Sequence, residues 1–133
     1  MADGLDLKVV TPKGSLIDAK VASFTGCSEL GEFCILPEHR PLMASLTAGR
    51  MIVELQGGEE MTYALDRGFL EAGLDHVNVI TEQCLVAEDL DKDEITSEVQ
   101  DLESELKDLD QGSSEAKELL LKLDWAKVRL SVL

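Results

Sequence analysis

Three cysteines and two histidines are the residues of this chain best suited to nucleophilic chemistry. Cys34 and His39 lie close in sequence, but Pro37 turns the chain between them, and no Gly-x-Ser-x-Gly motif is present. Cys27, Cys34 and Cys84 each have small or apolar neighbours, which is typical of buried free thiols. A structural role for the thiols is therefore favoured, and a small hydrolase that uses Cys34 and His39 stays open as an alternative.

Neither a metal site nor a phosphate-binding loop is indicated by residue spacing. Zinc needs about four ligands at short paired spacings, and the cysteines and histidines form no such pairs. The pair Gly57-Gly58 is flanked by two glutamates, which would repel phosphate. His76 begins an expected strand after a turn and is interpreted as a solvated residue. We therefore expect no catalytic residues, no metal and no bound cofactor.

A charged loop, Pro37-Glu38-His39-Arg40-Pro41, follows the apolar run Phe33–Leu36 and is the most informative segment. Proline fixes φ near about −65° and has no N–H, so the two prolines end strand pairing on both sides of the charged tip. Loops on apolar strands commonly carry the contacts of all-β domains. The pattern predicts a rigid docking surface that displays Glu38, His39 and Arg40. His39 is either a contact residue or plain surface.

The elements that must position this loop are short β runs between about residues 5 and 86. These runs are Leu5–Thr11, Ser15–Thr25, Glu32–Leu36, Leu42–Leu46, Arg50–Leu55, Met61–Leu65, Phe69–Ala72 and His76–Thr81. In the second run, Leu16, Ala19, Val21 and Phe24 are the apolar candidates. Short, closely spaced strands are typical of an antiparallel sandwich or barrel.

After residue 88 the pattern changes to charged residues with apolar residues at helical spacing. The first apolar stripe is Ile95, Val99, Leu102, Leu106 and Leu109, and the second is Ala116, Leu119, Leu120, Leu123, Ala126 and Leu130. Asp91 or Asp93 can cap the first helix, Gly112 can end it, and Ser113 or Ser114 can cap the second. We expect an antiparallel α-helical hairpin domain at 88–133, which packs alone or lies on the sheet, after an antiparallel β-sandwich domain at 1–87.

Composition narrows the classes of partner. The 133 residues carry a formal net charge of −15, which disfavours nucleic acid and anionic lipid and suits basic protein surfaces or solubility alone. No run reaches the ~20 apolar residues of a membrane span, and the acidic amino end lacks the features of a secretory signal. We expect a protein of a reducing compartment without direct membrane insertion.

Several motifs together resemble the epsilon subunit of F-type ATP synthases, the counterpart of the mitochondrial delta subunit. They are the opening 7–12, the segment Gly31–Leu42, Arg67-Gly68-Phe69-Leu70-Glu71, His76–Thr81 and the final 126–130. The resemblance covers nearly the whole chain. It implies the same architecture, a β-sandwich followed by a helical hairpin.

The resemblance also implies a function, a non-catalytic rotor subunit of the central stalk. Such a subunit links the gamma subunit to the membrane ring of c subunits, couples proton flow to ATP synthesis, and lies at the cytoplasmic face of the bacterial inner membrane. Glu32 matches the acidic residue that meets the c ring, and His39 matches a histidine near the gamma and c contacts. Glu29 and Glu38 extend this acidic patch, and Arg40 completes the expected contact set.

Departures from the family pattern qualify this reading. Cys34 stands where the family has a second glycine, so the backbone there must avoid φ > 0 or accept strain. Glu94 replaces the arginine of an ATP-binding motif, which predicts no tight ATP binding. In self-inhibiting relatives the hairpin meets an acidic loop of the beta subunit; the acidic first helix here predicts weak or absent inhibition. The alternative function is a freestanding adaptor whose acidic hairpin binds a basic helical partner.

Overall fold

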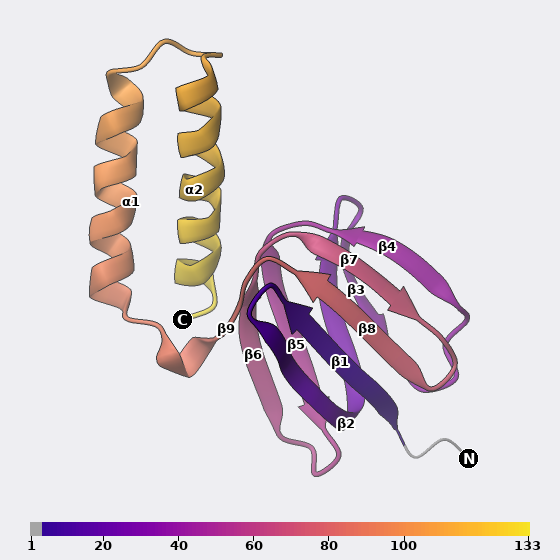
Figure 1. The fold of residues 1–133 in the computed structure, drawn as a ribbon. Coiled ribbons are helices and arrows are strands. Elements are labelled where there is room, and N and C mark those ends of the chain that lie inside the picture. Colours follow the sequence, from indigo (N-terminus) through magenta and orange to yellow (C-terminus); the bar gives the residue numbers. More distant parts are fainter. Residues whose placement is uncertain (1–3) are drawn as a thin grey trace.

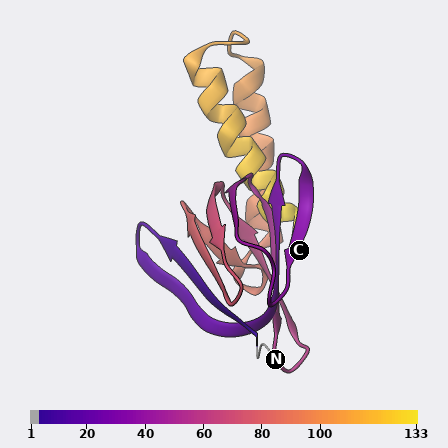
Figure 2. The ribbon, with the colours of Figure 1, turned by 90° about the vertical axis from the view of Figure 1, so that its right-hand side faces the viewer.

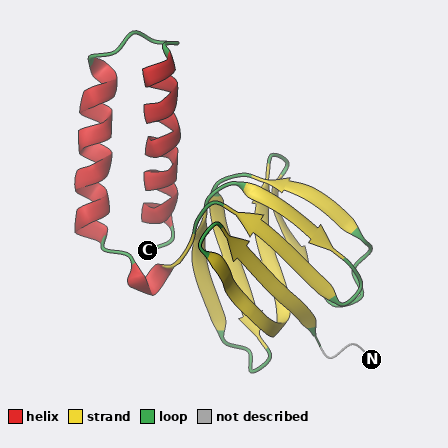
Figure 3. Cartoon of the chain, viewed as in Figure 1, coloured by secondary structure: helices red, strands yellow, loops and turns green. Residues whose placement is uncertain are grey.

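A computed structural model describes residues 4–133 as a β-sandwich followed by two antiparallel helices (Figures 1 and 3). The strands are β1 (Leu5–Thr11), β2 (Gly14–Ser28), β3 (Gly31–Ile35), β4 (Leu42–Leu46), β5 (Gly49–Leu55), β6 (Glu60–Leu65), β7 (Gly68–Ala72), β8 (His76–Thr81) and β9 (Cys84–Val86). A 3-10 turn (Ala87–Asp89) leads into the helices α1 (Lys92–Lys107) and α2 (Ser114–Ser131). The predicted fold class is confirmed.

The strands pair in the order β4-β7-β8-β1-β2-β5-β6-β9, and β3 pairs with β2 outside this path. The long strand β2 connects the two layers, because its first half pairs with β1 and its second half pairs with both β3 and β5. Two features differ from the prediction: β9 is an additional strand on β6, and β1 pairs with β8 in parallel. The other pairs among the described strands are antiparallel.

The sandwich core is built from alternating apolar residues, as in β1, where Leu5, Leu7 and Val9 are buried. Of the four apolar candidates in β2, Val21 and Phe24 are buried. They can share the core despite an odd spacing because the pairing of β2 with β5 shifts register between Val21 and Ser23.

The other two β2 candidates, Leu16 and Ala19, were predicted wrongly and are exposed. The first half of β2 pairs with β1, whereas β5 begins to pair only at Val21. The β1–β2 hairpin therefore curves away from the packed layers (Figure 2). Without β5 beside it, this half of β2 leaves Leu16 and Ala19 exposed, whereas Val9 on β1 is still covered because β1 also pairs with β8.

The helical hairpin has its own apolar core and the predicted caps at the start of both helices, but the predicted end at Gly112 is wrong, because α1 ends at Lys107 with Asp108 as its cap. The Asp91 side chain accepts the backbone N–H groups of Asp93 at 2.9 Å and Glu94 at 3.2 Å, and the Ser113 side chain accepts that of Ala116 at 3.1 Å. The seam consists of Ile95, Leu102, Leu123 and Ala126 with five partly buried neighbours. Leu120, predicted to join it, is half-exposed instead, because it lies to one side of the stripe on α2.

The opposite face of α2 packs on the sandwich near β5 and β6. On a helix, Trp125 lies away from the seam formed by Leu123 and Ala126, yet it is only 8% exposed. Because α2 contacts β5 and β6, the hairpin packs mainly on itself and touches the sandwich through this helix. No helix within residues 4–133 has the length and apolar character needed to cross a membrane.

Candidate partner-contact surface

The contact loop (residues 36–41) joins β3 to β4 and is held by the turn between β7 and β8. The backbone N–H of Glu38 donates to the carbonyl oxygen of Leu74 in that turn at 2.6 Å, and the N–H of His39 donates to that of Leu36 at 3.1 Å. Glu38 has φ of 69°, a left-handed conformation that is uncommon for a residue with a side chain. Neighbouring structure therefore fixes the loop in a conformation that its sequence alone disfavours.

The three charged residues of the loop tip differ in exposure. Glu38 and Arg40 are exposed, as expected, whereas His39 is half-buried. The Nδ1 atom of His39 lies 2.6 Å from the carbonyl oxygen of Arg40. The ring therefore lies back along the loop, while the two flanking side chains extend into solvent.

Glu32 already has an internal partner. Its carboxylate accepts from the Arg50 guanidinium on β5 through Nη2 at 3.0 and 3.3 Å and through Nε at 3.3 Å. Both side chains are about half-exposed, and ion pairs of that kind contribute only about 0–1 kcal/mol. A cationic partner can therefore compete with Arg50 for this carboxylate. Among residues 4–133, Glu29, Glu38 and Arg40 form no ion pair within 4.0 Å.

Three of the five predicted contact residues share one hollow. An open depression of about 530 Å³ lies beside β3 and β4 and is lined by Glu29, Glu32 and His39. Glu38 and Arg40, on either side of His39 in the contact loop, do not line it. The depression thus runs along β3 as far as His39 of the contact loop, and of the five predicted contact residues Glu38 and Arg40 stand apart from it.

Exposed apolar side chains accompany these charges and were missed in the sequence. Leu30, in the β2–β3 turn, is 100% exposed, and Met43 on β4 is 82% exposed. Leu36 in the contact loop is also exposed. The sequence signal that could have revealed this surface was Leu30, a leucine in a short turn between two strands, where a side chain points into solvent. Apolar side chains next to charged ones are the composition of protein–protein contact surfaces.

The three cysteines differ in exposure and lie in different surroundings. Cys84 is buried, and burial raises its pKa to about 12. The expectation that all three thiols are buried is wrong for Cys34, which is exposed because its side chain alternates outward from that of Ile35. Cys34 has ordinary strand pairing with Thr25 and no positive φ, so the missing family glycine causes no strain. Within residues 4–133, no group of three or more potential metal ligands occurs.

The exposures of the thiols predict their labelling. Iodoacetamide should modify Cys34 in the native protein at the rate of an ordinary exposed thiol, whereas Cys84 should react only after unfolding. Mass spectrometry of native and urea-treated samples measures both. No hydrogen bond between Cys34 and His39 is found in the described chain. If Cys34 were labelled much faster than a cysteine of the denatured protein, the hydrolase alternative that uses these two residues would be favoured again.

A charged cluster next to the contact loop was also missed. The Nε2 atom of His76 lies 2.8 and 2.9 Å from the two Glu71 oxygens, and Nδ1 lies 3.2 Å from Asp75. Asn78 donates to Glu71 at 3.1 Å. The hydrogen bonds to Glu71 and Asp75 raise the pKa of His76, and the bond to His76 lowers the pKa of Glu71. The interpretation of His76 as a merely solvated residue is therefore wrong.

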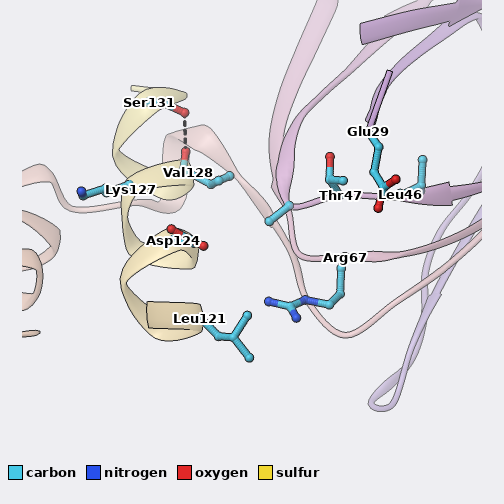
Figure 4. A pocket seen from close by; sticks show the side chains of 10 residues that line it. Glu29, Leu46, Thr47, Arg67, Leu121, Asp124, Lys127, Val128 and Ser131 are labelled. Carbon is cyan, nitrogen blue, oxygen red and sulfur yellow. Dashed lines mark hydrogen bonds between the residues drawn. The ribbon is translucent and has the colours of Figure 1, made fainter. Parts of the chain in front are cut away.

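A second hollow, of about 650 Å³, lies between α2 and the sandwich (Figure 4). Leu121, Asp124 and Val128 line it from the helix, and Glu29 and Arg67 line it from the sandwich. The residues that line it from α2 all belong to the C-terminal part of that helix. No sequence pattern could predict it, because it depends on the relative placement of the two parts.

Comparisons with known proteins agree with this architecture. A family model described as "ATP synthase, Delta/Epsilon chain, beta-sandwich domain" matches residues 4–87. The "ATP synthase epsilon chain" of Geobacter metallireducens is 30% identical over 132 residues, and that of Trichlorobacter lovleyi is 28% identical; each alignment covers 99% of this chain and 95% of the relative.

Two solved structures share the fold at low sequence identity. A chain of the Euglena gracilis mitochondrial ATP synthase structure, OSCP/F1/c-ring, aligns with a TM-score of 0.77 at 18% identity, covering 99% of this chain and 78% of that one. A chain of the Tetrahymena thermophila mitochondrial ATP synthase central stalk and c-ring aligns with a TM-score of 0.58 at 9% identity, covering 96% of both chains.

Proposed function

We start from the premise that this chain belongs to the ATP synthase delta/epsilon family. We propose that it is a rotor subunit that joins the gamma subunit to the c ring. The chain is thus a non-catalytic epsilon-type subunit of ATP synthase, and the proposal concerns its contacts and its role in coupling. The observation that supports it most is the exposure of Glu29, Glu32 and Glu38 around β3, beside exposed apolar side chains.

Carboxylates are suited to the polar loops of a c ring, which in the family typically offer arginine. An arginine guanidinium can bind a carboxylate through several N–H groups at once, and Arg50 already binds Glu32 through both Nε and Nη2. Such pairs fix orientation and register more than they add affinity. We propose that Glu29 and Glu32 meet the ring, and that Glu38, His39 and Arg40 contact gamma and the ring.

Co-purification separates this function from the adaptor alternative. A tagged full-length chain expressed in its own cells should retain gamma and c subunits after detergent extraction. This outcome also supports a peripheral position at the cytoplasmic face of the inner membrane. Recovery of an unrelated basic protein without gamma or c would favour the freestanding adaptor.

We also propose that 1–87 and 88–133 are separate domains. The buried apolar residues of the sandwich cluster all lie between Leu5 and Cys84, and those of the hairpin cluster lie between Ile95 and Ala126. The 3-10 turn Ala87–Asp89 connects them and buries none of its residues. Two separate cores with a short exposed connection are the usual organisation of two domains.

Removal of residues 88–133 should change the ATP hydrolysis rate of the assembled complex by less than about twofold, because like charges oppose insertion beside an acidic loop. The first helix carries eight acidic and two basic side chains between residues 91 and 108. ATPase rates of complexes with the full and the truncated chain measure this. A large increase on truncation would show that the hairpin inhibits.

The start of α1 predicts weak nucleotide binding. The Asp91 carboxylate is occupied as the helix cap, and Glu94 places a second carboxylate in the first turn. Both would repel phosphate, so calorimetric titration of the isolated chain should show no saturation with Mg-ATP up to about 1 mM, a free energy near −4 kcal/mol. Micromolar affinity would contradict this prediction.

A further inference from the structure

The cluster around His76 has a geometry that depends on protonation. Nε2 faces the Glu71 carboxylate at 2.8 and 2.9 Å, and Nδ1 faces Asp75 at 3.2 Å. A neutral imidazole has a single N–H, so it can donate to only one of these carboxylates. Only the imidazolium, with two N–H groups, can hold both at once. The arrangement therefore belongs to the protonated ring.

The ring also lies against the turn that supports the contact loop. A side-chain carbon added at Gly73 would lie 2.3 Å from Cε1 of His76, so the ring covers this glycine directly. The backbone of Gly73 donates to the carbonyl oxygen of His76 at 2.9 Å and closes the turn. The next residue, Leu74, accepts the N–H of Glu38 at 2.6 Å. A short chain of contacts thus connects the imidazole to the left-handed residue of the loop.

We propose that His76 is a positioning residue whose protonation sets the order of the contact loop. The imidazolium joins Glu71 on β7 to Asp75 in the turn, fixes the Gly73-Leu74 backbone, and so holds Glu38 in its left-handed conformation. Loss of the proton releases one carboxylate, loosens the turn and weakens the Glu38–Leu74 hydrogen bond. This contact loop is the one proposed above to contact the gamma subunit and the c ring, so a regulatory role of His76 rests on the proposed function.

Acidic residues on the neighbouring elements favour the protonated ring, and two lysines on β1 and β2 oppose it. Asp6 on β1 is in register with His76 and is exposed on the same face of the sheet. Lys20 on β2 lies 3.7 Å from Asp6 and offsets part of its charge, and Lys8 follows along β1. From the contact loop, Glu38 is the charged residue bonded to the turn. Together with Glu71 and Asp75, acidic residues outnumber basic ones around the ring.

The direction of the pH dependence follows from this. The pKa of His76 in the folded chain lies above its ordinary value of 6.5. The stabilising contribution of the pair is therefore complete below pH 6.5 and is lost as the pH rises through the raised value. The contact loop should be ordered at slightly acidic pH and looser at alkaline pH.

The test is a pH titration of the isolated full-length chain by NMR. In the wild-type chain, the backbone amide resonance of Glu38 should shift with the same midpoint as the His76 ring. The His39→Gln variant, which leaves His76 as the only histidine, should retain this titration. In His76→Gln the shift should vanish, and hydrogen exchange at the Glu38 amide should become severalfold faster at pH 6.

Two results would overturn the proposal: an amide of Glu38 that does not titrate, or one that follows His39 and is lost in His39→Gln. If His76→Gln fails to fold, the midpoints in wild type and His39→Gln still decide the matter. None of these measurements needs gamma or the c ring. The NMR titration can therefore refute the coupling of His76 to Glu38 without testing the proposed function. Failed co-purification would contradict the proposed function and would say nothing about this coupling.

Discussion

Reversing the charge of Glu32 and Glu38 together is expected to reduce incorporation of the chain into ATP synthase more than about tenfold. A partner arginine would then face lysine in place of carboxylate, and like charges placed together at an interface cost several kcal/mol, where 1.4 kcal/mol is a factor of ten. Proton-driven ATP synthesis of inverted membranes should fall in parallel. The measurements are the epsilon-to-gamma ratio in purified complexes and the rate of synthesis under an imposed proton gradient.

The control is a reversal of the same size elsewhere. Glu59 and Glu60, at the β5–β6 turn, are exposed and lie outside both the depression and the contact loop. Glu59→Lys/Glu60→Lys should assemble normally. Circular dichroism of Glu32→Lys/Glu38→Lys should remain native, since the lost pair with Arg50 is half-exposed and contributes little. Normal synthesis by the Glu32→Lys/Glu38→Lys complex would disprove the proposed contacts.

The strands and helices were predictable because their apolar residues follow simple periods. Leu5, Leu7 and Val9 alternate in β1, and Ile95 and Leu102 in α1 are spaced by seven residues, so burial of one face fixes each element. The strand β9 was missed because three residues, Cys84–Val86, are too few to show a period.

Two departures of the backbone from a regular ladder leave no trace in the sequence pattern. The irregularity between Val21 and Ser23 places Phe24 in the core at a spacing that simple alternation forbids. The left-handed conformation of Glu38 is likewise invisible in sequence, because glutamate rarely adopts it without support from the β7–β8 turn.

The predicted contact residues were identified from resemblance and charge, and their surroundings required the structure. The pairing of Glu32 with Arg50 joins residues 18 positions apart on strands that both flank β2. The His76 cluster depends on a turn that brings Glu71 and Asp75 to opposite sides of one ring. Long-range pairing of this kind leaves no local pattern in a single sequence.

Replacing Trp125 by alanine is expected to release the hairpin from the sandwich and to lower stability by about 3–5 kcal/mol. Trp125 is the only tryptophan, is 8% exposed on the face of α2 away from α1, and lies under the Arg129 guanidinium at 5.4 Å. Urea denaturation measures the loss, and hydrogen exchange should increase in α2. The matched control is Leu120→Ala on the same helix. Its side chain is half-exposed, so this substitution should change the free energy of unfolding by no more than about 0.5 kcal/mol.

The same variant separates two reasons for weak inhibition by the hairpin. If docking alone restrains it, the released hairpin of Trp125→Ala should inhibit ATP hydrolysis by the assembled complex. If the negative charge of α1 is decisive, release should leave the rate unchanged, because the like charges remain. We expect an unchanged rate, since charge repulsion acts on the hairpin wherever it lies, whereas docking acts only while Trp125 is covered. Equal stability losses in Trp125→Ala and Leu120→Ala would show instead that the sandwich does not hold the hairpin.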